Sequence, residues 1–269
     1  MADFRQERGP GLRRFAEPEP EPATTLRPDS RSRGVGRWHA EVMTTLLIAG
    51  ATGATGTVLV PKARAAGLKV IPHVRPKTAA KHLLGTDPDA LVCDLSDKAA
   101  LDKAMAGCEV IACLVGTTRH RFAQGDSYES SDYQPVIDLI ESAKRAGGAP
   151  RYFILLSALG SRKGSGYLGW KFRAEEAVQK SGLPFSIIRP SFFDSSGTGA
   201  QPSDGKSRTP PPIYGGMMKL IGKLPGLHDF AERLRPISLD DLAGAIVKIA
   251  IARAPSGQVL EGDKLRKLL

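Results

Sequence analysis

The sequence is poor in cysteine, in aromatic residues and in long apolar runs. Its three cysteines (Cys93, Cys108, Cys113) are too few, and odd in number, for a disulfide framework, and the first and last sit in apolar runs as small hydrophobic residues. No apolar run reaches the ~18 residues that a membrane-spanning helix needs. Met1 to Gly11 also lacks the apolar core of a signal peptide. These absences predict a cytoplasmic protein with no membrane partner.

Two further absences limit the chemistry. The five histidines show no metal-ligand spacing and the cysteines form no CxxC pair, so we predict no metal. The formal net charge is +10, but the basic residues are scattered and aromatics make up only 6% of the chain. No stacking motif of the RNA-recognition kind is present. Attraction of small phosphate-bearing molecules explains this charge as well as nucleic acid does, and we predict a small-molecule substrate.

The first 42 residues differ in composition from the rest. They contain the proline–acid repeat EPEPEP (17–22) and the arginine-rich SRSRGVGRW (30–38), with almost no apolar periodicity. Such a segment buries too little apolar surface to offset its ordering entropy, so we predict a disordered N-terminal extension over residues 1–42. Met43 stands directly before the first predicted strand and is an alternative start of the chain.

From residue 44 onward, apolar strand-like runs alternate with helical patterns. In YQPVIDLIESAKRAGG, for example, apolar residues recur at helical spacing. Several runs are almost wholly apolar, as strands covered on both faces must be. The alternation predicts an α/β fold, a doubly wound parallel sheet of the Rossmann type, over residues 43–269. The predicted strands are 45–49, 69–74, 90–94, 109–115, 151–157, 185–189 and 258–262.

Three glycines at three-residue spacing follow the first predicted strand and open a helix. Gly50 suits a tight turn, Gly53 lets the backbone approach a pyrophosphate, and Gly56 lets helix and strand pack closely. The spacing is GxxGxxG rather than the simpler GxGxxG. The alternative is a plain turn, but the position between strand and helix favours phosphate binding at the helix N-terminus.

The residues beyond this loop bear on the choice of dinucleotide. NAD sites usually place an acid about 20 residues past the loop, whereas the first acid after Gly56 here is Asp87. Arg75 and Lys77 stand in its place, and cations suit a 2′-phosphate. Ordinary exposed charges are the alternative interpretation. We predict that NADP(H) is preferred over NAD(H).

A tyrosine and a lysine follow the fifth predicted strand at helical spacing. Tyr167 and Lys171 are four residues apart, on one face of a helix. A nearby ammonium favours the phenolate and draws a tyrosine pKa toward neutrality, and the same lysine can bond the nicotinamide ribose. Ser157, at the end of the strand, is the candidate that polarises the substrate oxygen, although Ser161 and Ser165 lie in the same loop. A chance pair on an amphipathic helix is the alternative.

These segments together resemble the atypical branch of the short-chain dehydrogenase/reductase superfamily. Within it, the chain is similar to the small Tat-interacting oxidoreductases and to NmrA-like NADP-binding proteins. The resemblance covers residues 44 to about 262 and rests on LLIAGATGATG, CLVGTTR, DYQPVIDLIESAKRAGG, YFILLSALG, YLGWK, IIRPS and LRPISLDDLAGAIV. Related folds often pair through the helices that flank such a YxxxK motif, which makes a homodimer an expectation of the resemblance.

The resemblance also implies roles for particular positions. Residues implied to wrap the pyrophosphate or meet the adenosine phosphate are Gly50, Thr52, Gly53, Ala54, Thr55 and Arg75. Residues implied to flank the adenine are Asp94 and Leu95. Residues implied to lie on the nicotinamide side are Val115, Gly116, Arg189, Pro190 and Ser191. Tyr167 and Lys171 match the catalytic pair.

One departure from the family pattern keeps other functions open. Many relatives carry paired serines after the fifth strand, whereas this chain has Ser157 and Ala158. If the second serine is the catalytic one, the triad is incomplete. The leading prediction is an NADP(H)-dependent oxidoreductase that transfers hydride to or from a small carbonyl or alcohol. The alternatives are an NADP-binding redox-sensing regulator and an epimerase or dehydratase of the same superfamily.

The C-terminal third contains a polar, loop-like stretch at residues 194–212. It is either a lid or an exposed insertion, and we predict a substrate-covering region around 192–236. The chain after the sixth strand is too short for a large nucleotide-sugar domain, which favours a smaller substrate.

Overall fold

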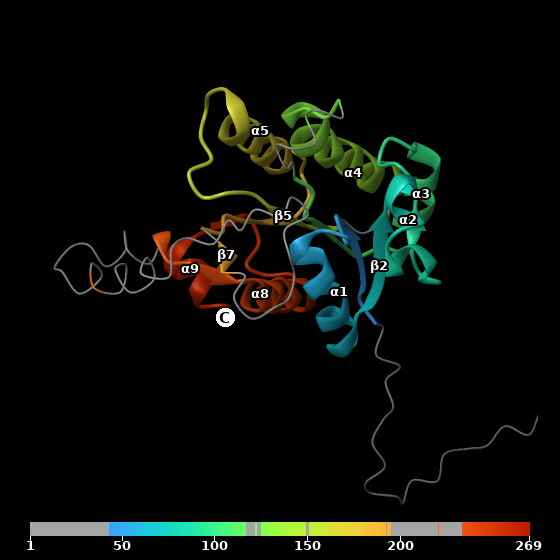
Figure 1. The fold of residues 1–269 in the computed structure, drawn as a ribbon, viewed down its shortest axis with the longest axis horizontal. Helices are drawn as coiled ribbons and strands as arrows, with labels where there is room; N and C mark the ends of the chain where they lie inside the picture. The colour runs from blue at the N-terminus through green and yellow to red at the C-terminus, as the bar shows by residue number, and fades with distance from the viewer. Residues whose placement is uncertain are drawn as a thin grey trace, which may run out of the picture. The chain divides into compact units, whose positions relative to one another are not determined.

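Parallel strands form the central sheet of this protein (Figure 1). The computed structural model describes residues 43–116, 122, 125–148, 151–191, 193–194, 220 and 233–269. The sheet strands within them are β1 (Thr45–Ala49), β2 (Lys69–Val74), β3 (Leu91–Val92), β4 (Val110–Cys113), β5 (Tyr152–Leu156), β6 (Phe185–Ile188) and β9 (Gln258–Leu260). All of their pairings are parallel. The predicted doubly wound parallel sheet is confirmed.

The strand order is β3-β2-β1-β4-β5-β6-β9. The chain runs outward from β1 through β2 to β3 and then returns to the other side of β1. Leu46 of β1 is therefore paired with Val70 of β2 on one side and with Val110 of β4 on the other. Such a reversal opens a crevice at the carboxyl ends of β1 and β4, where ligands bind in folds of this kind.

Helices cover both faces of the sheet (Figure 1). On one face lie α1 (Ala54–Ala65) and α8 (Leu239–Ala252). On the other lie α3 (Lys98–Met105), α4 (Gln134–Arg145) and α5 (Gly166–Lys180). Two of these helices begin at caps that the sequence encodes. Asp97 accepts a bond from the Ala100 amide at 3.1 Å, and Ser238 accepts one from Asp241 at 3.0 Å.

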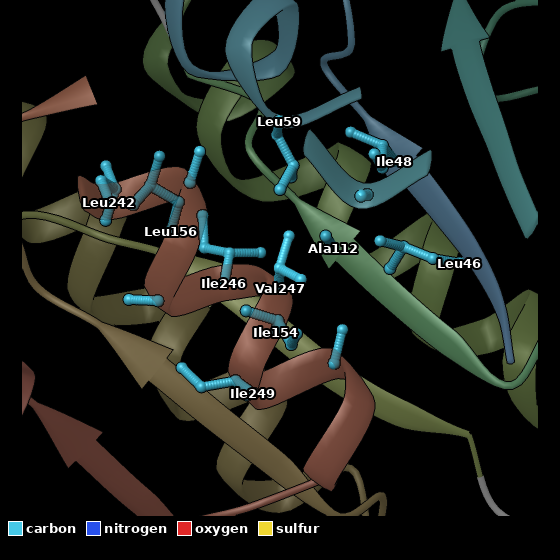
Figure 2. Close-up of a cluster of buried hydrophobic side chains, with 14 of the residues drawn as sticks. Leu46, Ile48, Leu59, Ala112, Ile154, Leu156, Leu242, Ile246, Val247 and Ile249 are labelled. Carbon is cyan, nitrogen blue, oxygen red and sulfur yellow. The ribbon is translucent and has the colours of Figure 1, made fainter. Parts of the chain in front are cut away.

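The core consists of two layers that share the strands. Leu46 and Ile48 of β1 point toward α1 and α8, where they join Leu59 and Ile246 (Figure 2). Leu47, on the opposite face of the same strand, joins the cluster under α3, α4 and α5. Because successive strand residues point to opposite faces, both sets must be apolar. This explains the unbroken apolar runs in the sequence.

Smaller elements complete the described part of the chain. They are α2 (Pro76–Ala79), the short 3₁₀ helix η1 (Leu83–Thr86), the π-helical turn η3 (Glu129–Tyr133), the paired strands β7 (Phe193–Asp194) and β8 (Ile237–Ser238), and α9 (Gly262–Arg266). Among the described residues, no helix has both the length and the apolar character that crossing a membrane requires. The extension at 1–42 and most of the predicted covering region at 192–236 lie outside the described residues, so both remain predictions.

Candidate functional site

The glycine loop follows the carboxyl end of β1, beside the end of β4. Gly50 follows β1 with φ +89°, a left-handed conformation that favours glycine. A Cβ on Gly50 would lie 3.1–3.3 Å from backbone atoms of Leu114 and Val115, directly after β4. The Leu114 amide in turn donates to the Ala49 carbonyl at 2.9 Å. The loop is thus pressed against the end of the neighbouring strand, which is where the predicted turn belongs.

Gly56 fits α1 tightly against the same loop. A Cβ at this position would come within 2.3 Å of the Gly50 carbonyl oxygen and 2.5 Å of the Ala51 carbonyl oxygen. No side chain fits there without moving the backbone. The role predicted for Gly56, close packing of helix and strand, agrees with this geometry.

The N-terminus of α1 is suited to an anion. Gly53 occupies the N-cap position and has no side chain that could accept a bond from the helix amides, and the first turn contains no acidic residue. The helix end therefore offers its first amides and its positive dipole end to a ligand. Among the neighbouring predicted residues, Thr52 is half-buried, Ala54 is exposed and Thr55 is buried. The residues present fit a bound pyrophosphate.

The residues predicted to meet the adenosine end lie on the same edge of the sheet. Arg75 and Lys77 are exposed one and three residues after β2. Asp94 is exposed two residues after β3 and is followed by the half-buried Leu95. Buried His73 connects these two segments, since its Nε2 donates to the Cys93 carbonyl at 2.9 Å. Burial lowers the pKa of His73 despite that bond.

Lys171 is buried between the ends of β4 and β5. Its Nζ lies 3.1 Å from Oδ1 of Asp132, in an ion pair whose side chains are 4% and 0% exposed. The same ammonium donates to the carbonyls of Val115 at 3.2 Å and Leu156 at 3.3 Å. Gly116 lies over the pair, because a Cβ there would be 3.3 Å from both charged atoms. The structure therefore brings Lys171 together with two of the predicted nicotinamide-side residues, Val115 and Gly116.

The charge of Lys171 depends on its neighbours. Burial acts to lower its pKa, but the Coulombic interactions with Tyr167 and Asp132 outweigh burial and raise the pKa above the ordinary lysine value. Lys171 is thus a fixed positive charge near the predicted catalytic tyrosine. Its Nζ lies 5.9 Å from the centroid of the Tyr167 ring.

The π-helical turn η3 supplies partners to α5. Asp132, within the turn, pairs with Lys171, and Tyr128, which precedes it, lies 5.9 Å from Tyr167 between ring centroids. Phe122 packs edge-on against Tyr128 at 4.7 Å. Turns of the π type are frequent at functional sites. Tyr167 itself is half-buried, at the rim of this group.

Ser157 is engaged elsewhere. It is buried at the end of β5 and donates its hydroxyl proton to Glu175 of α5, through a short contact with Oε1. The Glu175 carboxylate also accepts a bond from Nε of Arg189 at 2.9 Å, and Arg189 lies 3.4 Å from Glu261 after β9. Arg189 is thus held in a partly buried ionic network. Among the described residues, the structure forms no hydrogen bond between Ser157 and Tyr167, because the serine hydroxyl donates to Glu175 instead.

The segment after β6 approaches the loop after β5. The buried Pro190 accepts a bond from the Leu159 amide at 3.0 Å, and the Ser191 hydroxyl donates to the Arg235 carbonyl at 2.5 Å. Both residues therefore lie on the correct edge of the sheet for their predicted role. Whether they approach a nicotinamide ring remains a prediction.

Two charged residues of this region were missed by the sequence analysis. Asp132 lies within the quoted segment DYQPVIDLIESAKRAGG, and Glu175 lies four residues after Lys171. Both are 1% exposed. An acid on the apolar face of a helix was the available signal, since buried carboxylates are almost always paired. The partners themselves lie 39 and 14–18 positions away in the chain and could not be read from spacing.

The comparison with family models identifies the class of protein. Residues 50–210 match the family described as NAD(P)H-binding, and because the match covers more than half of the chain, the chain belongs to this family. With the relatives described next, the match places the chain in the atypical part of the short-chain dehydrogenase/reductase superfamily.

The curated relatives include plant proteins. The chain is 30% identical over 172 residues to the chloroplastic protein TIC 62 of Oryza sativa subsp. japonica. This match covers 54% of this chain and 34% of that protein. It is 26% identical over 200 residues to sanguinarine reductase of Eschscholzia californica, covering 58% of this chain and 72% of that enzyme. The chain spans only 26–34% of the length of the TIC 62 proteins that it matches. The predicted cytoplasmic location remains a prediction.

Solved structures share the fold. A short-chain dehydrogenase/reductase superfamily protein from Agrobacterium tumefaciens with bound NAD superposes with a TM-score of 0.57 at 19% identity, covering 81% of this chain and 77% of that one. An anaerobillin reductase from Escherichia coli O157:H7 gives 0.54 at 20% identity, covering 80% and 95%. At these identities the likeness shows the fold alone.

Proposed function

We propose that this protein is an NADP(H)-dependent oxidoreductase that acts on a small carbonyl or alcohol. One observation carries the proposal. A glycine loop fitted for a pyrophosphate and a buried, charged lysine beside a half-buried tyrosine lie along one edge of the same sheet. A binding protein needs the first of these features, whereas a lysine held charged beside a tyrosine is an arrangement suited to proton transfer.

Backbone groups and small residues would hold the cofactor. The α1 N-terminus and Gly53 would bind the pyrophosphate, and Gly50 and Gly56 would keep the loop close to the sheet. Val115 and Gly116, which follow β4, would face the nicotinamide half. The bound nicotinamide supplies or accepts the hydride.

The preference for NADP(H) rests on the charges after β2. Arg75 and Lys77 stand exposed where NAD-binding folds usually carry an acid. The first acid beyond the glycine loop, Asp87, is bound by Arg64 at 2.7 and 2.9 Å, so a ribose would have to compete with that pair. A guanidinium suits a 2′-phosphate because its planar donors match phosphate oxygens.

Tyr167 would move the proton. In the reduction direction its hydroxyl gives a proton to the substrate oxygen while the hydride adds to the carbonyl carbon, so that the carbonyl becomes an alcohol. The fixed charge of Lys171 favours the tyrosinate that this step leaves behind. Asp132 and the two carbonyls keep the ammonium in place.

The cofactor assignment is tested by titration with NADPH and NADH, followed by intrinsic fluorescence. We expect micromolar binding of NADPH and much weaker binding of NADH. Arg75→Glu should weaken NADPH binding at least tenfold and reduce the ratio of the NADPH affinity to the NADH affinity. Lys144→Glu is the control, because it makes the same charge change on an exposed residue at the end of α4, where the strands begin. An unchanged NADPH/NADH ratio in Arg75→Glu would refute the assignment.

The catalytic assignment is tested with a panel of quinones, aldehydes and ketones. Tyr167→Phe should lower NADPH-dependent turnover by at least 100-fold, because general acid catalysis supplies on the order of 10²–10⁴. Tyr128→Phe is the matched control, since it removes the neighbouring phenol and keeps both rings. Full turnover in Tyr167→Phe would remove the tyrosine from the mechanism.

A second candidate function is supported by Ser157. Because its proton is donated to Glu175, the serine predicted to polarise the substrate is engaged within the protein. This favours a redox-sensing NADP-binding regulator of the NmrA-like kind. Tight NADPH binding with slow oxidation that no carbonyl of the panel accelerates would support that function over the enzyme.

A further inference from the structure

Ser161 has an unusual environment for a hydroxyl group. Ser161 is 7% exposed, and among the described residues its Oγ has no hydrogen-bond partner. Buried polar groups in native proteins are almost always hydrogen-bonded, because an unmade bond leaves the group desolvated without compensation. An unpartnered buried hydroxyl therefore calls for an explanation, and a ligand that completes the bond is one.

The position of Ser161 connects it to the proposed active site. Its amide donates to the Ala158 carbonyl at 3.2 Å, which closes a turn just after β5. A Cβ on Gly160 would lie 3.7 Å from Cδ1 of Leu168, so this turn packs on the first turn of α5, the turn that carries Tyr167. On its other side, the Leu159 amide bonds Pro190.

Ser157, four residues earlier, offers a direct contrast. Both serines are buried in the connection between β5 and α5, but Ser157 donates to Glu175, whereas Ser161 has no acceptor among the described residues. A hydroxyl that already donates to a carboxylate would have to give up that bond to serve a ligand. Ser161 would give up none.

We propose that Ser161, rather than Ser157, donates the hydrogen bond to the carbonyl oxygen of the bound ligand. This deepens the proposed function and rests on it. During reduction the oxygen gains negative charge, and a fixed donor stabilises that charge without giving up its own proton. Tyr167 still provides the proton that is transferred. The acceptor is a carbonyl oxygen, either of the substrate or of the nicotinamide carboxamide.

The test compares three alanine variants of the full chain: Ser161→Ala, Ser157→Ala and, as the control, Ser165→Ala at an exposed serine of the same loop. The first measurement is the thermal midpoint without ligand. Ser161→Ala should keep or raise the midpoint, because it removes a buried polar group that has no partner to lose. Ser157→Ala should lower it by roughly 3–8 °C, because Glu175 loses a donor.

The second measurement is the NADPH dissociation constant and the turnover of the panel carbonyl that the wild type reduces fastest. We expect Ser161→Ala to lose on the order of 100-fold in kcat/KM. An unchanged NADPH dissociation constant assigns the bond to the substrate oxygen, and a tenfold weaker one assigns it to the carboxamide. Ser165→Ala should change neither quantity.

Two results would overturn the proposal. Ser161→Ala could lower the midpoint as Ser157→Ala does, which would mean that its hydroxyl has a partner within the protein. It could also leave affinity and turnover unchanged. Both differ from failure of the proposed function, in which the wild type itself binds no NADPH.

Discussion

The two halves of the candidate site, at the carboxyl ends of the sheet strands, are built from different kinds of contact. At the ends of β1 and β4, the contacts are made by backbone and by glycines, and a Cβ on Gly56 would fall 2.3 Å from a carbonyl oxygen. At the ends of β5 and β6, they are made by charged side chains: the buried pair of Lys171 with Asp132, and the half-buried Arg189 with the buried Glu175.

The difference fits the roles that we propose for the two halves. A phosphate is bound well by amides and a helix dipole, and these need only room for the backbone to approach. A proton transfer needs a charge of fixed sign at a fixed place, and a buried charge persists only when it is paired. We therefore expect substitutions that add side-chain volume to impair stability and binding most in the first half, and substitutions that remove a charge to do so most in the second.

The largest effect is expected from breaking the buried pair in the second half. Asp132→Asn keeps the shape of the side chain but leaves Lys171 as a buried, unpaired charge. We expect the free energy of unfolding at pH 7 to fall by ~3–5 kcal/mol, measured by urea denaturation. Lys171→Met in the same chain should restore much of the loss, because it removes the unpaired charge. Glu129→Gln, an exposed acid of the same turn, should change stability by less than about 0.5 kcal/mol.

The pH dependence of Asp132→Asn gives a second check. In the wild type the pKa of Lys171 is raised, so its contribution to stability is complete below its unfolded value and is lost as pH rises through the folded value. In the variant the Asp132 contributions are lost while burial continues to oppose the remaining Coulombic interaction with Tyr167, so that pKa should fall from its wild-type value. The stability difference between wild type and variant should then shrink as pH rises toward about 10.4, the ordinary lysine value, because the unpaired ammonium is neutralised. If the loss of unfolding free energy caused by Asp132→Asn stayed constant from pH 7 to 10, Lys171 would not be a charged, unpaired group in the variant.

An intermediate effect is expected from added volume in the first half. Gly56→Ala should lower the free energy of unfolding by ~1–3 kcal/mol, because the new Cβ overlaps two backbone carbonyls. It should also weaken NADPH binding at least tenfold in the fluorescence titration. Gly107→Ala is the matched control, since a Cβ there has nothing within 4 Å. Equal stability of the two variants would refute the close packing of α1 on the loop.

The smallest effect is expected from an ion pair that belongs to neither half. Lys62 of α1 and Asp240 of α8 lie 2.8 Å apart, but their side chains are 34% and 61% exposed. A double-mutant cycle with alanine at both positions should give a coupling of about 0.2–1 kcal/mol that decreases in 1 M salt. A coupling as large as that of Asp132 with Lys171 would show that burial is not what separates the two kinds of pair.

Much of the first half could be predicted from the sequence. β1 and β2 have the predicted bounds, and the glycine loop follows β1 as its spacing indicated. β3 is shorter than predicted, Leu91–Val92 instead of 90–94, because as an edge strand it pairs only with His73 and Val74. β4, β5, β6 and β9 are also shorter than predicted, by one to three residues each. Apolar residues continue beyond the paired part of β4 as Leu114 and Val115, whereas β5 and β6 end before the polar residues Ser157 and Arg189.

The second half was only partly predictable. Tyr167 and Lys171 were found because both lie on one helix, four residues apart. The partners of Lys171 and Tyr167 come from other elements of the fold. The Ser157 hydroxyl, which was predicted to polarise a substrate, donates to Glu175 instead. No periodicity within one segment reports which side chains of distant segments will meet.

The sequence by itself determined the alternation of strands and helices, the double layer of apolar residues and the glycine turn. These depend on interactions between near neighbours in the chain and on the side to which each residue points. Only the tertiary structure decided which buried charges are paired and that the buried hydroxyl of Ser161 has no hydrogen-bond partner among the described residues. Those outcomes depend on distances between atoms whose residues are 14–64 positions apart, as for Glu175 with Arg189 and for the Thr45 amide with Glu109. Such distances are set when the layers pack, and not before.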